Sequence, residues 1–210
     1  MTEGTGEHAA HARLFAGLLG DAGTATVEEV AARAGVSPGA AAETLAALER
    51  GGLLEPMTPG AYRAVRLDSR ELRELYPVVL LLEATAVRDA TRLDPETLTA
   101  LRAANQRLRL TDDPDEAARA DDDFHRALTA GCGNERLLAV LDPVRRALLR
   151  YEQVYMAAPE RRERSAAAHD GIVAALEQGD HLAAAALVRE NFTSALNELT
   201  RALDARRPPD

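Results

Sequence analysis

The segment VEEVAARAGVSPGAAAETLAALERGGLLE, residues 27–55, contains two short helical patterns separated by a turn. Thr26 and Glu29 have the spacing of a capping box, in which each side chain bonds the backbone amide of the other residue. A first helix is therefore expected to begin there. The Gly-Val-Ser turn at residues 35–37 supplies a second N-cap, so a second helix is expected to run to about Arg50, where a glycine pair ends it.

The flanks of this segment complete a recognisable order of elements. After it, LLEPMTPGAYRAVRL (residues 53–67) predicts two short strands around the turn at 58–60. Before it, residues 8–19 form a helical pattern with one apolar stripe, made of Leu14, Phe15, Leu18 and Leu19. A helix, a helix-turn-helix and a hairpin, in this order, predict a winged helix-turn-helix domain over residues 1–67.

From Asp68 onward the pattern indicates only helices and connectors. Acidic caps mark helix starts at Asp68, Asp94 and Asp113, and in the last two a proline follows at the first helical position. Later helices are expected in three ranges: 134–157, 160–178 and 181–206. Pro143 predicts a kink or break. The fold class expected is mostly α, with the winged helix-turn-helix followed by an all-α antiparallel bundle over residues 68–210.

Composition excludes several classes of protein. Hydrophobic residues make up 46% of the 210 residues and charged residues 28%, as in ordinary globular domains. No run of 18 apolar residues occurs and no signal peptide is evident, so we expect a cytoplasmic protein with no membrane partner. The single cysteine, Cys132, excludes an internal disulfide framework. The net charge of −9, with 3% aromatic residues and no lysine, argues against nonspecific nucleic-acid binding.

Three polar residues of the helical half could hold a metal ion. Asp121 and His125 are four residues apart, so on a helix they face the same way, and His169 shares a face with apolar neighbours further along. A carboxylate and two imidazoles are suitable ligands for a divalent transition metal such as zinc or nickel. The same spacing also fits a salt-bridged aspartate and two ordinary core histidines.

The helical half resembles a known family. DDDFHRALTAGCGNERLLAVL (residues 121–141) and HDGIVAALEQGDHLAAAALVREN (residues 169–191) resemble the FCD effector-binding domain of FadR-type GntR transcription regulators. The resemblance covers about residues 68–200. It implies a metal at the floor of a ligand cavity, held by Asp121, His125, His169 and a third histidine. Asn191 occupies the position of that third histidine.

Two departures from the family pattern affect the expected chemistry. An amide oxygen at Asn191 is a poorer ligand for zinc or nickel than imidazole, which leaves a three-residue site completed by water or ligand, a weak fourth contact, or no metal. The stretch 76–83 lacks the arginine that many members use to bind a carboxylate effector. Candidate pocket residues are Asn134, which also fits a helix N-cap, and Tyr151 and Tyr155, which also fit the core.

The DNA-reading half also resembles bacterial regulators, and its second helix would enter the major groove. GntR regulators usually carry arginine at the positions of Pro38 and Ala42, and both are missing here. Residues 1–66 hold five arginines against eight acidic residues. The candidates that remain for DNA contact are Arg33, Ser37, Thr44, Arg63 and Arg66.

The sequence therefore favours a homodimeric, ligand-responsive regulator that binds a double-stranded DNA operator and a small-molecule effector, and that is not an enzyme. A metal-dependent enzyme on the same helical domain is the first alternative, since a metal with an open position can activate water. No separate general base stands out for it. A protein-binding sensor on the same helical domain, with a degenerate winged helix, is the second alternative.

Overall fold

The computed structural model describes residues 24–50, 54–65, 67–90 and 94–205. By its internal contacts the chain divides into two compact units, Met1–Leu67 and Asp68–Asp210. Within the described ranges, none of the helices combines the length and the apolar character that crossing a bilayer requires.

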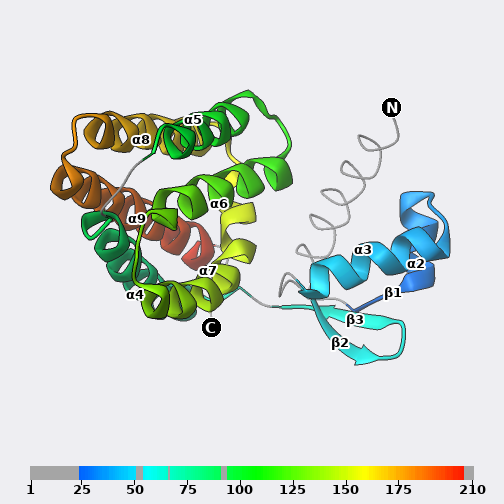
Figure 1. The fold of residues 1–210 in the computed structure, drawn as a ribbon. Helices are drawn as coiled ribbons and strands as arrows, with labels where there is room; N and C mark the ends of the chain where they lie inside the picture. Colours follow the sequence, from blue (N-terminus) through cyan, green and yellow to red (C-terminus); the bar gives the residue numbers. More distant parts are fainter. Residues whose placement is uncertain (1–23, 51–53, 66, 91–93, 206–210) are drawn as a thin grey trace. The chain divides into compact units, whose positions relative to one another are not determined.

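The first unit joins two helices to a small antiparallel sheet (Figure 1). Its elements are β1 (Thr24–Thr26), α2 (Val27–Ala34), α3 (Pro38–Arg50), β2 (Leu54–Thr58) and β3 (Ala61–Ala64). Strand β3 pairs with both other strands, in the order β1-β3-β2. The predicted helix-turn-helix and hairpin are confirmed, and β1 is an addition because three residues are too short to show an alternating pattern. The helix predicted over residues 8–19 lies outside the described residues.

Local hydrogen bonds explain where these helices begin and end. Both bonds of the predicted capping box are present, with Thr26 N donating to Glu29 Oε2 at 3.0 Å and Glu29 N donating to Thr26 Oγ1 at 3.2 Å. Gly35 ends α2 with φ of 67°, a left-handed conformation that glycine adopts without a Cβ clash. Ser37 Oγ then accepts a hydrogen bond from Ala40 N, so the serine caps α3 as predicted.

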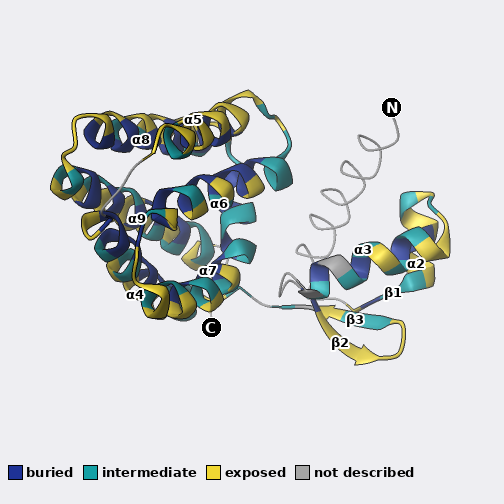
Figure 2. Ribbon diagram, in the orientation of Figure 1, coloured by how far each residue is buried: buried dark blue, intermediate teal, exposed yellow. Residues whose placement is uncertain are grey.

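The first unit has its own small apolar core. Its buried members are Ala25, Val30, Ala31, Ala41, Leu45, Leu48 and Leu54. They come from both helices and two strands, so the core fixes α3 against the sheet and leaves the opposite side of the helix to solvent (Figure 2).

The second unit is entirely helical in its described residues. Its elements are α4 (Ser69–Arg88), α5 (Pro95–Leu110), α6 (Pro114–Ala130), α7 (Glu135–Met156), α8 (Pro159–Glu177) and α9 (His181–Asp204). Asp68, Asp94 and Asp113 accept the capping hydrogen bonds predicted for them. The mostly α fold class is thus confirmed.

The proline at position 143 does not break its helix. Helix α7 runs through Pro143 as one element, so of the predicted kink or break, the break does not occur. Proline removes one backbone donor and leaves the carbonyl of residue 139 without its helical partner. Both Pro143 and Ala139 are exposed, so water can bind that carbonyl and the helix can continue.

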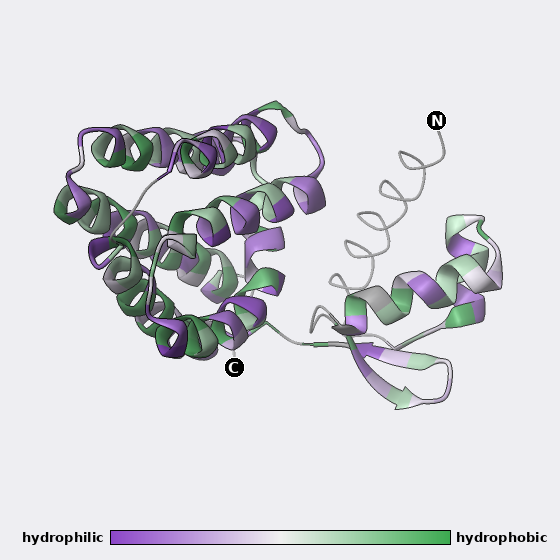
Figure 3. Cartoon of the chain, viewed as in Figure 1, coloured by the Kyte–Doolittle hydropathy of each residue, from purple (hydrophilic) through white to green (hydrophobic). Residues whose placement is uncertain are grey.

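The bundle buries one face of each helix. Helix α4 packs against α7 and α9, while α5 packs against α6 and α8, and α8 packs against α9. Figure 3 shows green apolar and purple polar stretches alternating along the helices of this unit. Several polar side chains are buried with the apolar ones, and the same part of the bundle contains both histidines singled out in the sequence.

Candidate metal centre and DNA-reading surface

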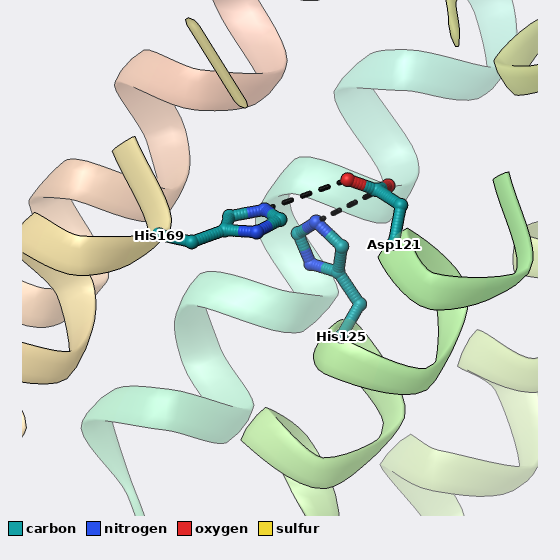
Figure 4. A group of neighbouring side chains, drawn as sticks. All are labelled: Asp121, His125 and His169. Atoms are coloured by element: carbon teal, nitrogen blue, oxygen red, sulfur yellow. Dashed lines mark ion pairs between the residues drawn. The ribbon is translucent and has the colours of Figure 1, made fainter. Parts of the chain in front are cut away.

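Asp121, His125 and His169 lie together inside the second unit (Figure 4). Helix α6 presents Asp121 and His125 from successive turns, and α8 presents His169 from the other side. Asp121 Oδ2 lies 3.8 Å from His125 Nε2, and Asp121 Oδ1 lies 3.5 Å from His169 Nε2. All three side chains are buried, and their ligand atoms lie within 4.8 Å of one another. The structure therefore brings together the three residues that the sequence singled out.

A buried carboxylate contacts the ring nitrogen of His125 that points away from the cluster. Glu83 Oε2 on α4 lies 2.7 Å from His125 Nδ1, and Arg145 on α7 donates to Glu83 Oε1 at 2.6 Å. Burial would raise the pKa of Glu83, but the charges of His125 and Arg145 lower it below its ordinary value. Burial opposes a charge on His125 as well, yet Glu83 and then Asp121 raise its pKa to about 9. Nδ1 of His125 thus faces an ionised acceptor. Nε2 faces the space between Asp121, His125 and His169, which is the centre of the cluster.

An amide holds His169. Asn105 Oδ1 on α5 lies 3.1 Å from His169 Nδ1. Phe124 stacks on the same imidazole, with ring centroids 3.7 Å apart and planes 6° from parallel, so the ring cannot turn without disturbing the core. Burial, and the nearby charge of His125, hold the pKa of His169 well below its usual value, so the ring is neutral.

The donor set and its spacing fit a divalent transition metal. Among the described residues, Nε2 of His169 is a buried polar atom with no hydrogen-bond partner. It faces the carboxylate of Asp121, whose pKa burial raises to about 6. Ligands about 2.1 Å from a tetrahedral zinc lie about 3.4 Å from each other. The separations of 3.8 Å and 3.5 Å from Asp121 to the two imidazoles are close to this value. A cation at this centre would satisfy the unpartnered nitrogen and the carboxylate together.

A half-buried carboxylate, which the sequence analysis did not single out, borders this group. Glu152 on α7 accepts a 2.8 Å hydrogen bond from the hydroxyl of Tyr76 on α4. Burial first, and the charge of Asp121 next, raise the pKa of Glu152 to about 8. Glu83, Asp121 and Glu152 thus interact with one another, and among the described residues Arg145 is the buried arginine that pairs with this group, through Glu83.

The fourth metal-ligand candidate, Asn191, is half-buried on α9. It lines a cavity of about 240 Å³ whose other walls include Tyr155, Arg164 and Leu187. Tyr155, predicted as a pocket residue, is thus beside a cavity, and burial raises the pKa of its hydroxyl.

The other two predicted pocket residues have structural roles at opposite ends of α7. Asn134 is exposed and caps the helix, with Oδ1 accepting from Leu137 N at 3.0 Å. Tyr151 is buried, and its hydroxyl contacts Glu71 and the backbone of Asp68 at the start of α4. Seventeen residues of helix separate Asn134 from Tyr151, a rise of about 25 Å. The two cannot line one small pocket.

On the first unit, the candidate DNA contacts have different environments. Arg33 is exposed at the end of α2. Ser37 is exposed but its Oγ caps α3, and Thr44 Oγ1 donates to Ala40 O at 2.9 Å. Both hydroxyls therefore already make hydrogen bonds within α3, which limits them to secondary contacts with bases.

The hairpin of β2 and β3 forms the wing, and it carries one described arginine of the two predicted. Arg63 on β3 is exposed and forms an ion pair with Glu55 on β2, with Arg63 Nη2 2.9 Å from Glu55 Oε2. The cross-strand pairing of these two residues explains the contact. Arg66 lies outside the described residues.

The comparison with family models concerns the second unit. A model of the FCD domain matches residues 74–194, more than half of the chain and all three members of the buried cluster. The chain belongs to the FCD-domain family. The match lies within the all-helical unit and confirms the resemblance noted for its helices.

Solved structures extend the likeness of this FCD-domain protein to the whole chain. It is similar to a GntR family member from Pseudomonas syringae pathovar tomato, at 20% identity, with 96% of this chain and 87% of that chain covered and a TM-score of 0.56. A putative GntR regulator from Rhodococcus has 20% identity, coverages of 93% and 96%, and a TM-score of 0.64. Escherichia coli McbR/YncC has 18% identity, coverages of 94% and 96%, and a TM-score of 0.61. A comparison with curated sequences found no match. At these identities the likeness shows the fold.

The sequence reading of this FCD-domain protein missed the residues behind the two histidines. Glu83 was seen only as part of a stretch without arginine, and Asn105 and Arg145 were not singled out. Each is a polar residue on the apolar face of an amphipathic helix, and that misplaced polarity was the available signal. Their partners lie 42 to 64 residues away, so spacing along the chain could not identify them.

Proposed function

We propose that this protein is a homodimeric transcriptional regulator of the GntR type, which binds an operator through its first unit and a small-molecule effector through its second. The observation that carries the proposal is the buried Asp121, His125 and His169 cluster, within an FCD domain that follows a winged helix-turn-helix on the same chain. The cytoplasm, where operator DNA is accessible, is part of the proposal.

In this proposal a divalent transition metal, zinc or nickel, is held by Asp121 and by Nε2 of the two histidines. The metal would supply a Lewis-acidic position for an oxygen or nitrogen atom of the effector. Three protein ligands leave at least one position for water or effector, and Asn191 is a candidate for a weak additional contact. Glu83 and Asn105 orient the imidazoles, and the apolar rings around them keep bulk water out.

In this proposal the main contact of the effector is not an arginine. Arg145 is buried near the centre, but its guanidinium is bonded to Glu83, to Thr129 Oγ1 and to the carbonyl of His125. Releasing it to bind a carboxylate effector would leave Glu83 as an unpaired buried charge. We therefore place the main effector contact on the metal.

Dimerisation follows from how operators are read. Two recognition helices spaced by a turn of DNA require two copies of the first unit, related by two-fold symmetry. Helix α4 offers an apolar surface for this contact, because Val78 is 42% exposed and Leu81, one turn further on, is 55% exposed. Side chains of this kind are commonly buried in homodimer interfaces.

A DNA-binding titration tests the proposal. The full-length protein, after metal analysis, is titrated against a labelled duplex from its own upstream region and against an unrelated duplex, with and without added zinc or nickel. Tighter binding to the upstream duplex, changed by the metal state, is the expected result. Failure to bind either duplex at low salt in both metal states contradicts the regulator proposal and leaves the enzyme and partner-binding alternatives.

A further inference from the structure

The amide of Asn105 has its orientation decided by its neighbours. Its Nδ2 lies 3.0 Å from the carbonyl oxygen of Ala166 and 2.7 Å from Oδ1 of Asp170. A backbone carbonyl can only accept, and the carboxylate of Asp170, whose other oxygen pairs with Arg109 at 2.8 Å, also accepts here. The NH₂ group must therefore face these two acceptors, since the flipped amide would set oxygen against oxygen twice.

This orientation decides which nitrogen of His169 carries hydrogen. The remaining end of the amide, Oδ1 of Asn105, faces Nδ1 of His169 at 3.1 Å and can only accept. Nδ1 must donate, and a neutral imidazole has only one N–H. Nε2 of His169 is then a bare lone pair directed at the centre, which agrees with its having no hydrogen-bond partner among the described residues.

We propose that Asn105 is a positioning residue that fixes His169 in its Nδ1–H tautomer and so keeps Nε2 ready for a metal ion before any metal arrives. The inference rests on the metal site of the proposed function, but the tautomer is a property of the metal-free protein. His125 also turns Nε2 toward the centre, with the charged partner Glu83 at Nδ1, whereas the partner at Nδ1 of His169 is a neutral amide. The two ligands are thus prepared by different chemistry.

The effect of removing Asn105 on metal affinity has an expected range. Partners of this kind, hydrogen-bonded to a metal-ligating histidine, typically contribute 10- to 100-fold to metal affinity. Without Asn105 the ring could place its hydrogen on Nε2, next to Asp121, and the metal would have to displace that hydrogen bond. We expect Asn105→Ala to weaken zinc binding about 10- to 100-fold.

The direct test is the tautomer in the metal-free, full-length protein. Long-range ¹H–¹⁵N correlation spectra of the histidine rings distinguish a protonated from a bare imidazole nitrogen. At neutral pH the His169 signals should show Nδ1 protonated and Nε2 bare. An Nε2–H tautomer in the wild-type protein overturns the proposal, whatever the metal affinity is.

Three variants separate positioning from general stability. Asp170→Asn is the matched control, because it removes the charge of Asp170 while the bond from Asn105 to Ala166 remains, so tautomer and affinity should persist. Asn105→Ala should lose both. The double variant Asn105→Asp with Asp170→Asn exchanges the amide and the carboxylate, so residue 105 still accepts from His169 and now accepts from residue 170. The tautomer should return, although the variant should fold less stably because an oxygen of residue 105 then faces the Ala166 carbonyl.

The outcomes distinguish this inference from the proposed function. Zinc affinity is measured by competition with a chromophoric chelator, and folding is checked by thermal melting. A folded Asn105→Ala protein with wild-type tautomer and affinity overturns the inference. If that variant does not fold, the wild-type spectrum and the exchanged pair still decide it. A wild type that shows the expected tautomer but binds no zinc contradicts the metal proposal and leaves the role of Asn105 in the tautomer intact.

Discussion

His125 and Glu83 meet in the interior of the helical unit, with Nδ1 of the imidazole 2.7 Å from a carboxylate oxygen that is fully shielded from solvent. The same carboxylate binds Arg145, so one buried glutamate joins α4, α6 and α7. A buried charge of this kind is stable only while its partners remain, because the interior screens it far less than water does. The proposed metal site therefore depends on Glu83, which is not one of its ligands.

Removal of this buried charge should be costly. Glu83→Gln leaves the guanidinium of Arg145 without its counter-charge, and breaking such a pair typically costs about 3–5 kcal/mol. Adding Arg145→Gln removes the unpaired charge, so the double variant should lose less stability than the two single losses added together. Urea unfolding of Glu83→Gln, Arg145→Gln and the double variant measures the three losses of stability.

Glu74→Gln provides the comparison for that series. It breaks the exposed Arg70–Glu74 ion pair on the same helix, which should cost less than about 1 kcal/mol. Equal losses for Glu83→Gln and Glu74→Gln would contradict the assigned role of the buried carboxylate.

Metal binding should stabilise the native protein and depend on both histidines. A ligand at 100 times its dissociation constant adds about 2.7 kcal/mol, or roughly 5–10 °C in melting temperature for a protein of this size. Chelator should reverse that gain, and His125→Ala or His169→Ala should abolish it. His181→Ala, outside the cluster, should keep it. Scanning calorimetry with elemental analysis measures this, and identical melting with and without chelator argues against a structural metal.

The pH dependence of stability should change when Glu152 is neutralised. Its pKa is raised from 4.5 in the unfolded chain to about 8 in the folded protein, so the metal-free protein loses stability as pH rises between these values. The groups that face it are Tyr76 and Glu83 from α4 and Asp121 and His125 from α6.

Glu152→Gln keeps an acceptor for the Tyr76 hydroxyl and has no charge to bury. The variant should match the wild type near pH 4.5 and melt several degrees higher at pH 8, because about 1 kcal/mol shifts melting by roughly 2–4 °C. Melting curves in chelator across this range provide the readout, with the exposed Glu135→Gln on the same helix as control. A constant difference at all pH values would show that packing, not charge, separates the two proteins.

The sequence predicted what is encoded locally. The Thr26–Glu29 box, the aspartate caps and the serine cap of α3 each involve residues two or three positions apart, and all form as expected. The Asp121–His125 pair follows in the same way from the period of a helix. These contacts depend on local geometry alone, so one sequence was sufficient.

The features that the sequence did not predict depend on tertiary packing. Glu83 approaches His125 only because α4 crosses the bundle, and Pro143 is tolerated because its side of α7 faces solvent. Asn134 and Tyr151 were assigned to one pocket from their residue types, but helix length places them far apart. Identity and spacing can suggest the metal ligands, whereas the groups that orient them emerge only from the three-dimensional arrangement.

The protein should be a homodimer through the exposed face of α4. Light scattering should give twice the chain mass of 22.5 kDa at micromolar concentration. Leu81→Asp should shift the equilibrium toward monomer, because it sets a charge in an apolar contact. Leu182→Asp is the control, since Leu182 is 71% exposed on a different helix. A wild-type protein of monomer mass contradicts the dimer.

DNA binding should show a shallow dependence on salt. Each phosphate that a protein neutralises contributes about 0.9 to the slope of log affinity against log salt, and few arginines are available on the described surface of the first unit. Arg63→Ala and Arg33→Ala should weaken binding to all duplexes alike, whereas changes at Ser37 or Thr44 should alter sequence preference.

The Arg63–Glu55 ion pair of the wing leads to a more specific expectation for the salt dependence of DNA binding. Glu55 lies 2.9 Å from Arg63 and competes with phosphate for its guanidinium. Glu55→Gln should therefore tighten binding and steepen the slope by up to about 1, the value of one phosphate contact. The gain should vanish in the double variant with Arg63→Ala, since it acts through that arginine. Anisotropy titrations at several salt concentrations, on the upstream and the unrelated duplex, measure both effects. A steep slope in the wild type, unchanged by Glu55→Gln and Arg63→Ala, would show that DNA contacts a surface other than this wing.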